Sequence, residues 1–131
     1  MIQKNTILIV DDQRSNVEFI ADILSNTYDV KAAIDGKKAL KLLEKFEFDL
    51  ILLDVQMPDM NGYEVAQKIL SSERTKDTPI IFLTSLNDEA SIVKGFEMGA
   101  VDYVTKPFNT QELLVRVANH IQMHDNHNMT F

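Results

Sequence analysis

Short apolar runs alternate with helix-like segments along the whole chain, and this alternation restricts the fold more than any other feature. Four runs of β-branched and aliphatic residues indicate buried strands, and a fifth, weaker run is consistent with another. The four runs cover residues 7–10, 50–53, 80–83 and 101–104, and the weaker one covers residues 28–33. The sequence therefore predicts five strands.

Between the runs, apolar residues recur at helical spacing in a polar background, within residues 17–24, 39–46, 65–69, 92–96 and 114–121. Asn61 with Glu64, and Asn109 with Glu112, have the spacing of helix N-terminal capping pairs. A β-α unit repeated in this way predicts parallel strands joined by right-handed crossovers. We expect a doubly wound α/β fold with helices on both faces of one sheet.

Length and composition limit the function classes. The 131 residues suffice for one core. A net charge of -7 argues against direct binding of nucleic acid, which requires concentrated Lys and Arg. The absence of cysteine excludes disulfides, thiolate metal sites and a cysteine nucleophile. The apolar run that ends at Asp11 is too short for a signal peptide or a membrane span, so we expect a cytoplasmic protein without a membrane partner.

Polar residues follow the apolar runs at the strand ends, where doubly wound sheets bind their ligands. They are Asp11 and Asp12, Asp54, Thr84 and Ser85, and Thr105 and Lys106. Three converging carboxylates would repel each other unless a cation lay among them. Oxygen ligands select Mg²⁺, with Mn²⁺ as a substitute. Asp12, Asp54 and the backbone carbonyl of Gln56 would suffice as protein ligands.

Transfer of a phosphoryl group to a carboxylate requires a nucleophile, a metal and a second positive charge. Asp54, Mg²⁺ and Lys106 would supply these, and the Thr84 hydroxyl could hydrogen-bond a phosphoryl oxygen. The bond from Lys106 to Pro107 is of the X-Pro type, the one peptide bond that can be cis at modest cost. A cis bond there would aim the lysine into the site.

Four motifs in this order resemble the receiver domains of two-component response regulators, and the resemblance covers about residues 6–122. The motifs are ILIVDD at 7–12, LLDVQMPDMNG at 52–62, IFLTS at 81–85 and DYVTKPF at 102–108. This resemblance implies a flavodoxin-like strand order, 2-1-3-4-5. It also implies that the chain is a signalling switch and not an enzyme acting on other substrates.

The resemblance gives each strand-end residue a role. Asp54 is similar to the phosphoacceptor, Asp12 to the direct Mg²⁺ ligand, and Asp11 to a residue that reaches the metal through water. Lys106 is similar to the lysine that pairs with the phosphoryl group. The expected donor is a sensor histidine kinase or a phosphotransfer protein, and the expected receiver of the signal is an output domain or protein.

Thr84 and Tyr103 resemble the switch pair of the family, in which the hydroxyl moves toward the phosphoryl group and the aromatic ring then turns inward. The expected output is a change of the face made by the fourth helix, fifth strand and fifth helix, including residues 92–96 and 113–116. That face could also hold a homodimer contact. An aromatic residue in a strand can equally be simple core packing, so both interpretations of Tyr103 stay open.

Three alternative functions compete with that of a phosphorylated receiver. A magnesium-dependent phosphatase with an aspartate nucleophile usually carries a second acid two residues later, where this chain has Gln56, which cannot protonate a leaving group. A nucleotide or flavin module needs a Gly-rich turn after the first strand, where this chain has acidic Asp11 and Asp12. A receiver-like interaction domain could signal without phosphate, but the complete acidic set and Lys106 argue against it.

The C-terminal region is polar. His120, His124 and His127 have the i, i+4, i+7 spacing of a metal site on one helix face, but we favour ordinary polar positions. We expect a receiver domain at residues 1–124, followed by a polar tail or the start of a linker at 125–131. An N-terminal receiver cut from a longer regulator fits this arrangement.

Overall fold

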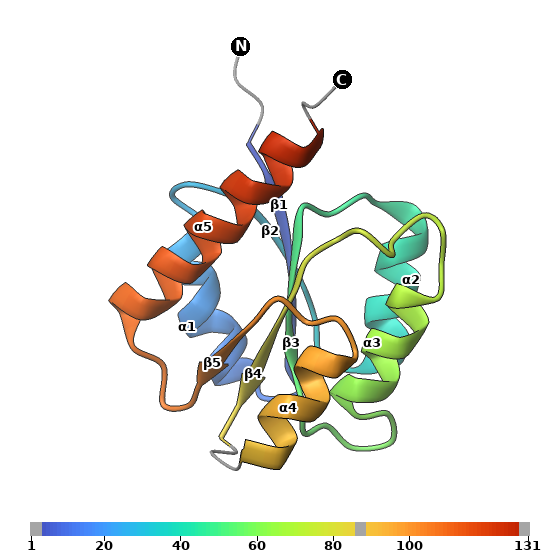
Figure 1. The fold of residues 1–131 in the computed structure, drawn as a ribbon. Coiled ribbons are helices and arrows are strands. Elements are labelled where there is room, and N and C mark those ends of the chain that lie inside the picture. Colours follow the sequence, from blue (N-terminus) through green and yellow to red (C-terminus); the bar gives the residue numbers. More distant parts are fainter. Residues whose placement is uncertain (1–3, 86–88, 129–131) are drawn as a thin grey trace.

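The computed structural model describes residues 4–85 and 89–128, which form one five-stranded sheet flanked by helices (Figure 1). The strands are β1 (Thr6–Val10), β2 (Asp29–Ala33), β3 (Leu50–Asp54), β4 (Ile80–Thr84) and β5 (Asp102–Thr105). The helices are α1 (Arg14–Leu24), α2 (Gly36–Lys45), α3 (Gly62–Leu70), α4 (Glu89–Glu97) and α5 (Thr110–Asn128). The predicted alternation of strands and helices is confirmed.

All strand pairs are parallel, and the order is β2-β1-β3-β4-β5. The predicted order 2-1-3-4-5 is therefore confirmed. The registers align the carboxyl ends of the strands, with Val10 opposite Leu53, Asp54 opposite Leu83, and Thr84 opposite Thr105. β2 pairs with one side of β1 and β3 with the other. The strand order therefore reverses at β1 and β3, and sheets of this kind bind ligands at the carboxyl ends of the strands at that point.

Alternate residues of each strand pack into two separate cores because side chains in a strand point to opposite faces. Leu8, Ile51 and Phe82 belong to the core beneath α2, α3 and α4, whereas Ile9 and Leu52 belong to the core beneath α1 and α5. Figure 1 shows these two helical layers on opposite sides of the sheet. Both faces are therefore covered, which explains why the central strands are apolar without alternation.

The predicted capping pairs are both present. Asn61 accepts a hydrogen bond from the Glu64 backbone N–H at 3.0 Å, and the Glu64 side chain accepts one from the Asn61 N–H at 3.2 Å. Asn109 accepts a hydrogen bond from the Glu112 N–H at 2.9 Å, directly before α5. Each bond satisfies a backbone donor that would otherwise be free in the first helical turn.

The last helix extends beyond the expected boundary, since α5 continues through Asn128. The Asn5 side-chain amide donates to both carboxylate oxygens of Asp125, at 3.1 and 3.3 Å. Residues 125–128, where we expected a polar tail or the start of a linker, belong to α5. Asp125 links this part of the helix to Asn5, which precedes β1. Among the described residues, no helix is both long and apolar enough to cross a bilayer.

Candidate functional site

The strand ends bring the predicted polar residues to one edge of the sheet. Asp11 and Asp12 follow β1, Asp54 is the last residue of β3, Thr84 is the last residue of β4, and Lys106 follows β5. Asp11, Asp54 and Thr84 are the buried polar or charged residues of the described chain. Because the strands are parallel and in register, these residues lie at the same edge of the sheet, as the sequence predicted.

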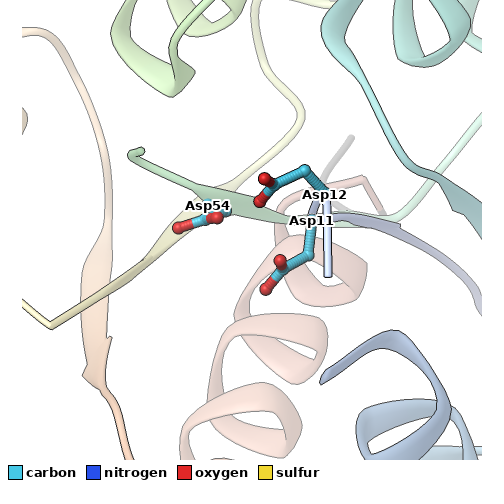
Figure 2. Close-up of side chains that lie close together, drawn as sticks. All are labelled: Asp11, Asp12 and Asp54. Carbon is cyan, nitrogen blue, oxygen red and sulfur yellow. The ribbon is translucent and has the colours of Figure 1, made fainter. Parts of the chain in front are cut away.

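The three carboxylates form a compact cluster. One oxygen from each of Asp11, Asp12 and Asp54 lies within 4.8 Å of the others, and Figure 2 shows the three side chains together at the ends of β1 and β3. Asp11 is fully buried, Asp54 is 2% exposed and Asp12 is partly exposed. Among the side chains that the structure describes, this is the one group of three or more acidic or histidine residues that could hold a metal ion.

Lys106 reaches into this cluster from the far side of β4. Its ammonium nitrogen lies 3.1 Å from Asp54 Oδ1 and 3.4 Å from Asp11 Oδ2. The peptide bond between Lys106 and Pro107 is cis, as the sequence suggested. The Lys106 N–H donates to the Thr84 carbonyl at 2.9 Å, which fixes the backbone at the start of the turn.

Asn16 is a contact that sequence reasoning missed. Its side-chain amide donates to Asp11 Oδ2 at 3.2 Å, while the Gln13 N–H donates to Asp11 Oδ1 at 2.9 Å. Both donors belong to the start of α1, so the helix fixes the orientation of the buried carboxylate. An amide one turn into the helix after the acidic pair was the signal that could have identified Asn16.

Asp54 has an unusual proton affinity. Burial and the neighbouring Asp11 charge raise the pKa of its carboxyl, which lies at about 6 in place of 3.8. The Lys106 ammonium and a 3.3 Å hydrogen bond from the Gln56 N–H oppose the rise without cancelling it. Negative charge at Asp54 is therefore only partly compensated by the protein alone.

The donor set fits a hard divalent cation. Three carboxylates face a single ammonium group, so full ionisation leaves an excess of two negative charges at the cluster. Carboxylate oxygens are the ligands of Mg²⁺ and Mn²⁺, and the cluster contains no sulfur or imidazole ligand that would favour zinc or copper. The chemistry of the residues thus supports the predicted Mg²⁺ site, whose individual ligands stay predictions.

Tyr103 is buried, with 8% of its surface exposed. Its ring lies 5.3 Å from the Phe96 ring of α4 and 5.8 Å from the Phe82 ring of β4, measured between centroids. The sequence linked an inward ring to the phosphorylated form, yet the ring is already inside in this structure. The packing role left open by the sequence is thus present, and a switching role requires that the ring also have an outward position.

Exposed apolar side chains are present on both α4 and α5. Val93 and Phe96 are each 47% exposed and Val115 is 55% exposed. Ile92 is partly buried against the core, and Leu113 is fully buried. The expected output face therefore presents Val93, Phe96 and Val115, whereas Leu113 supports α5 from beneath.

The histidines near the C-terminus pair with separate carboxylates. His120 Nε2 lies 3.0 Å from Asp102 Oδ2, and His124 Nε2 lies 3.8 Å from Asp49 Oδ1. Asp102 also accepts a 2.7 Å hydrogen bond from Arg116. His120 and His124 thus fasten α5 to the sheet, a role that the sequence did not indicate, and the His127 side chain lies outside the described part of the chain.

Comparison with known proteins gives one consistent result. The family model described as response regulator receiver domain matches residues 7–118. A relative from Vibrio cholerae, named a probable cyclic di-GMP phosphodiesterase, is 46% identical over 117 residues, covering 89% of this chain and 26% of that protein. The DNA-binding dual master transcriptional regulator RpaA of Synechocystis is 40% identical over 112 residues, covering 85% of this chain and 46% of that protein.

A solved structure agrees. The chemotaxis response regulator CheY4 of Vibrio cholerae superposes with a TM-score of 0.85 at 33% sequence identity, covering 90% of this chain and 99% of that one. The chain spans less than half the length of the curated relatives given above. The shared region in those relatives is therefore one part of a larger protein.

Proposed function

The chain belongs to the response regulator receiver domain family, and from that premise we propose that it accepts a phosphoryl group on Asp54 and passes the change to the α4-β5-α5 face. The main support for this proposal is the position of Asp54. It is the last residue of β3, lies within 4.8 Å of two further carboxylates, and has Lys106 at 3.1 Å. A carboxylate in this setting combines a nucleophile with partners for added negative charge.

Asp12 and Asp54, with the backbone carbonyl of Gln56, would hold Mg²⁺, and Asp11 would reach it through water. Bound Mg²⁺ would neutralise the phosphoryl oxygens and the carboxylate cluster. The geometry of Asp11 supports the indirect role, because Lys106, Asn16 and the Gln13 N–H already occupy its oxygens. For Asp12, the described residues give no hydrogen bond to the carboxylate, which suits a direct ligand.

In the proposed reaction, a carboxylate oxygen of Asp54 attacks the phosphorus of a phosphohistidine on a histidine kinase or phosphotransfer protein. An O–P bond forms at Asp54 and the N–P bond of the donor breaks, with its electron pair returning to the imidazole. Lys106 holds a positive charge beside the accepting carboxylate throughout, and Thr84 supplies a hydroxyl for a phosphoryl oxygen. Hydrolysis of the acyl phosphate by water would reset the switch.

The proposed output begins at Thr84 and Tyr103. Thr84 is buried at the end of β4, and Tyr103 lies on the neighbouring strand against α4. A shift of the Thr84 hydroxyl toward the phosphoryl group would favour the inward Tyr103 ring. The equilibrium between two ring positions then carries the signal, with a coupling of about 1–3 kcal/mol.

Incubation with a small phosphodonor and Mg²⁺, followed by mass analysis of peptides, tests the assignment. One phosphoryl group is expected at Asp54 in the wild type and none in Asp54→Ala. Lys106→Ala controls for the second positive charge and should accept phosphate more slowly. Modification that survives in Asp54→Ala, or many turnovers of phosphate release from an ester substrate, would instead favour a different acceptor or a phosphatase.

A further inference from the structure

Gly95 lies buried near the C-terminal end of α4, directly against the ring of Tyr103. A β-carbon added at Gly95 would overlap with the Tyr103 hydroxyl and lie 2.7 Å from Cζ of the same ring. It would also lie 3.1 Å from Cδ2 of Phe82. Nonbonded carbon atoms repel at such separations, so no side chain fits at position 95 while the ring is inside.

The backbone does not require glycine at this position. Among the described glycines, positive φ occurs at Gly99, with a value of 108°, and not at Gly95. Any residue could adopt the helical backbone of Gly95, and alanine would form a more stable helix interior than glycine does. The space for Tyr103 is therefore the physical reason for glycine here.

Three elements hold the inward ring. Phe82 of β4 and Phe96 of α4 contact the ring, and the Tyr103 hydroxyl meets the Tyr63 side chain of α3 and the backbone of Gly95. Burial raises the pKa of Tyr103, the neighbouring Tyr63 raises it further, and the hydrogen bond with the Gly95 backbone opposes that rise. The hydroxyl is thus paired inside the protein, and this inner position is a specific site.

We propose that Gly95 is the positioning residue that admits the Tyr103 ring to its inward position, and that a methyl group at residue 95 holds the ring outside and uncouples Asp54 from the α4-β5-α5 face. The inference rests on the proposed function for its link to phosphorylation. Its structural part, the competition between a side chain at position 95 and the Tyr103 ring, is independent of that link.

The ring, and not the helix, is expected to give way. The end of α4 is fixed, because the Ala100 N–H donates to the Gly95 carbonyl at 3.1 Å and the Val101 N–H donates to Ile80 at 2.9 Å. Partly buried Ile92 also packs α4 against the core. By contrast, Tyr103 can leave by rotation about a single side-chain bond between staggered rotamers.

The first experiment measures ring exposure in Gly95→Ala. With ¹³C-labelled tyrosine and a soluble paramagnetic agent, the Tyr103 ring signals should broaden several-fold more in Gly95→Ala than in the wild type, while the signals of Tyr28, which packs in the other core, change little. Val93→Ala is the matched control, since Val93 is an exposed position of the same helix. An unchanged Tyr103 ring, or equal broadening in Val93→Ala, overturns the inference.

A stability comparison tests the same contact if Gly95→Ala folds poorly. In the wild-type background, Gly95→Ala should lower the melting temperature because it displaces the ring. In a Tyr103→Ala background, the same substitution should raise the melting temperature, because the overlap with the Tyr103 ring is gone, the emptied space lets Phe82 move by a few tenths of an ångström, and alanine favours the helix. A decrease of similar size in both backgrounds means that the methyl group collides with something other than Tyr103, which overturns the proposal.

The link to phosphorylation is tested with beryllofluoride, a mimic of the phosphoryl group. Gly95→Ala should bind it about 5–150-fold more weakly than the wild type, the range expected for lost coupling, while Mg²⁺ affinity stays the same. If the Tyr103 ring is exposed in Gly95→Ala but the variant binds beryllofluoride as tightly as the wild type, the ring position is not coupled to Asp54. If the wild type accepts no phosphoryl group at Asp54, the proposed function is wrong. The measurement of ring exposure and the comparison of melting temperatures would then still test the role of Gly95.

Discussion

At the scale of single residues, Asp54 combines burial with a charge that the protein only partly compensates. Its carboxyl lies beside Asp11, and Lys106 is the cation in contact with both. An acid in this setting prefers to be protonated, or to have a further positive charge close by. The chemistry of the site and the stability of the fold are therefore coupled through one side chain.

Replacement of Asp54 by asparagine should stabilise the metal-free protein above pH 6. The unfolded carboxyl loses its proton near pH 3.8 and the native one near 6, so between these values the native state binds more protons and wild-type stability falls as pH rises. Asp54→Asn avoids this loss, so its free energy of unfolding should exceed that of the wild type by about 3 kcal/mol at pH 8. Urea unfolding with a chelator should show the gain at pH 8 and none below pH 4; a pH-independent difference would contradict it.

Asp12 and Asp11 should differ in their contribution to metal binding. Asp12→Asn is expected to weaken Mg²⁺ affinity by about 100-fold or more, and Asp11→Asn by about tenfold, because the second acts through water. The buried Asp11 carboxylate is also held by Lys106 and Asn16, which removes it further from direct ligation. Mg²⁺ titration followed by NMR or calorimetry measures both, and equal losses would refute the ranking.

At the scale of elements, β4 and β5 connect the site to the surface. Thr84 ends β4 beside Thr105 of β5, and Tyr103 lies two residues earlier on β5 against α4. β5 is an edge strand with one neighbour, so its displacement disturbs fewer hydrogen bonds than that of a central strand would. A change at Thr84 can thus reach α4 through β5.

Thr84→Ala should separate acceptance of phosphate from its effect. The variant keeps Asp54 and Lys106 and should still be phosphorylated, but it lacks the hydroxyl that would attract a phosphoryl oxygen. Amide exchange in β5 and α4, with and without beryllofluoride, should change several-fold in the wild type and much less in Thr84→Ala. A full response in Thr84→Ala would disprove the relay while leaving the phosphorylation site intact.

Sequence patterns predicted the elements and the strand-end residues well because both depend on local signals. The capping pair at Asn61 and the polar residues after each strand could be located from spacing alone. The contact of Asn16 with Asp11, and the pairing of His120 with Asp102, depend on side-chain directions and distant partners that no local pattern contains. The buried position of Tyr103 was equally beyond the sequence, since a strand pattern does not determine a rotamer.

At the scale of the whole molecule, the two faces of the sheet differ. On one face, α5 is linked to β5 by the bonds of Asp102 with Arg116 and His120. The α4 side instead carries the Tyr103 ring and exposed Val93 and Phe96. The Tyr103 ring and α4 can therefore move while α5 stays bound to the sheet on the opposite face.

Self-association through the α4-β5-α5 face should depend on phosphorylation. Light scattering with beryllofluoride and Mg²⁺ is expected to show a dimer for the wild type, because Val93, Phe96 and Val115 expose apolar surface. Val115→Glu should reduce dimer formation at least about tenfold, since it would bury a charge. Phe46→Glu, an exposed aromatic at the end of α2, is the matched control, and an equal loss there would argue against this face.

The hydrogen bonds between Asn5 and Asp125 have a consequence for how such a chain can be built into others. They join a side chain near the start of the described chain to one near its end, with the Asn5 amide nitrogen 3.1 and 3.3 Å from the Asp125 carboxylate oxygens. Both residues lie at the end of the sheet opposite Asp54 (Figure 1). A host protein could accept the whole unit in a single surface loop without being forced apart. Recombination could thus graft the switch onto unrelated machinery while the acceptor edge stays open to its donor.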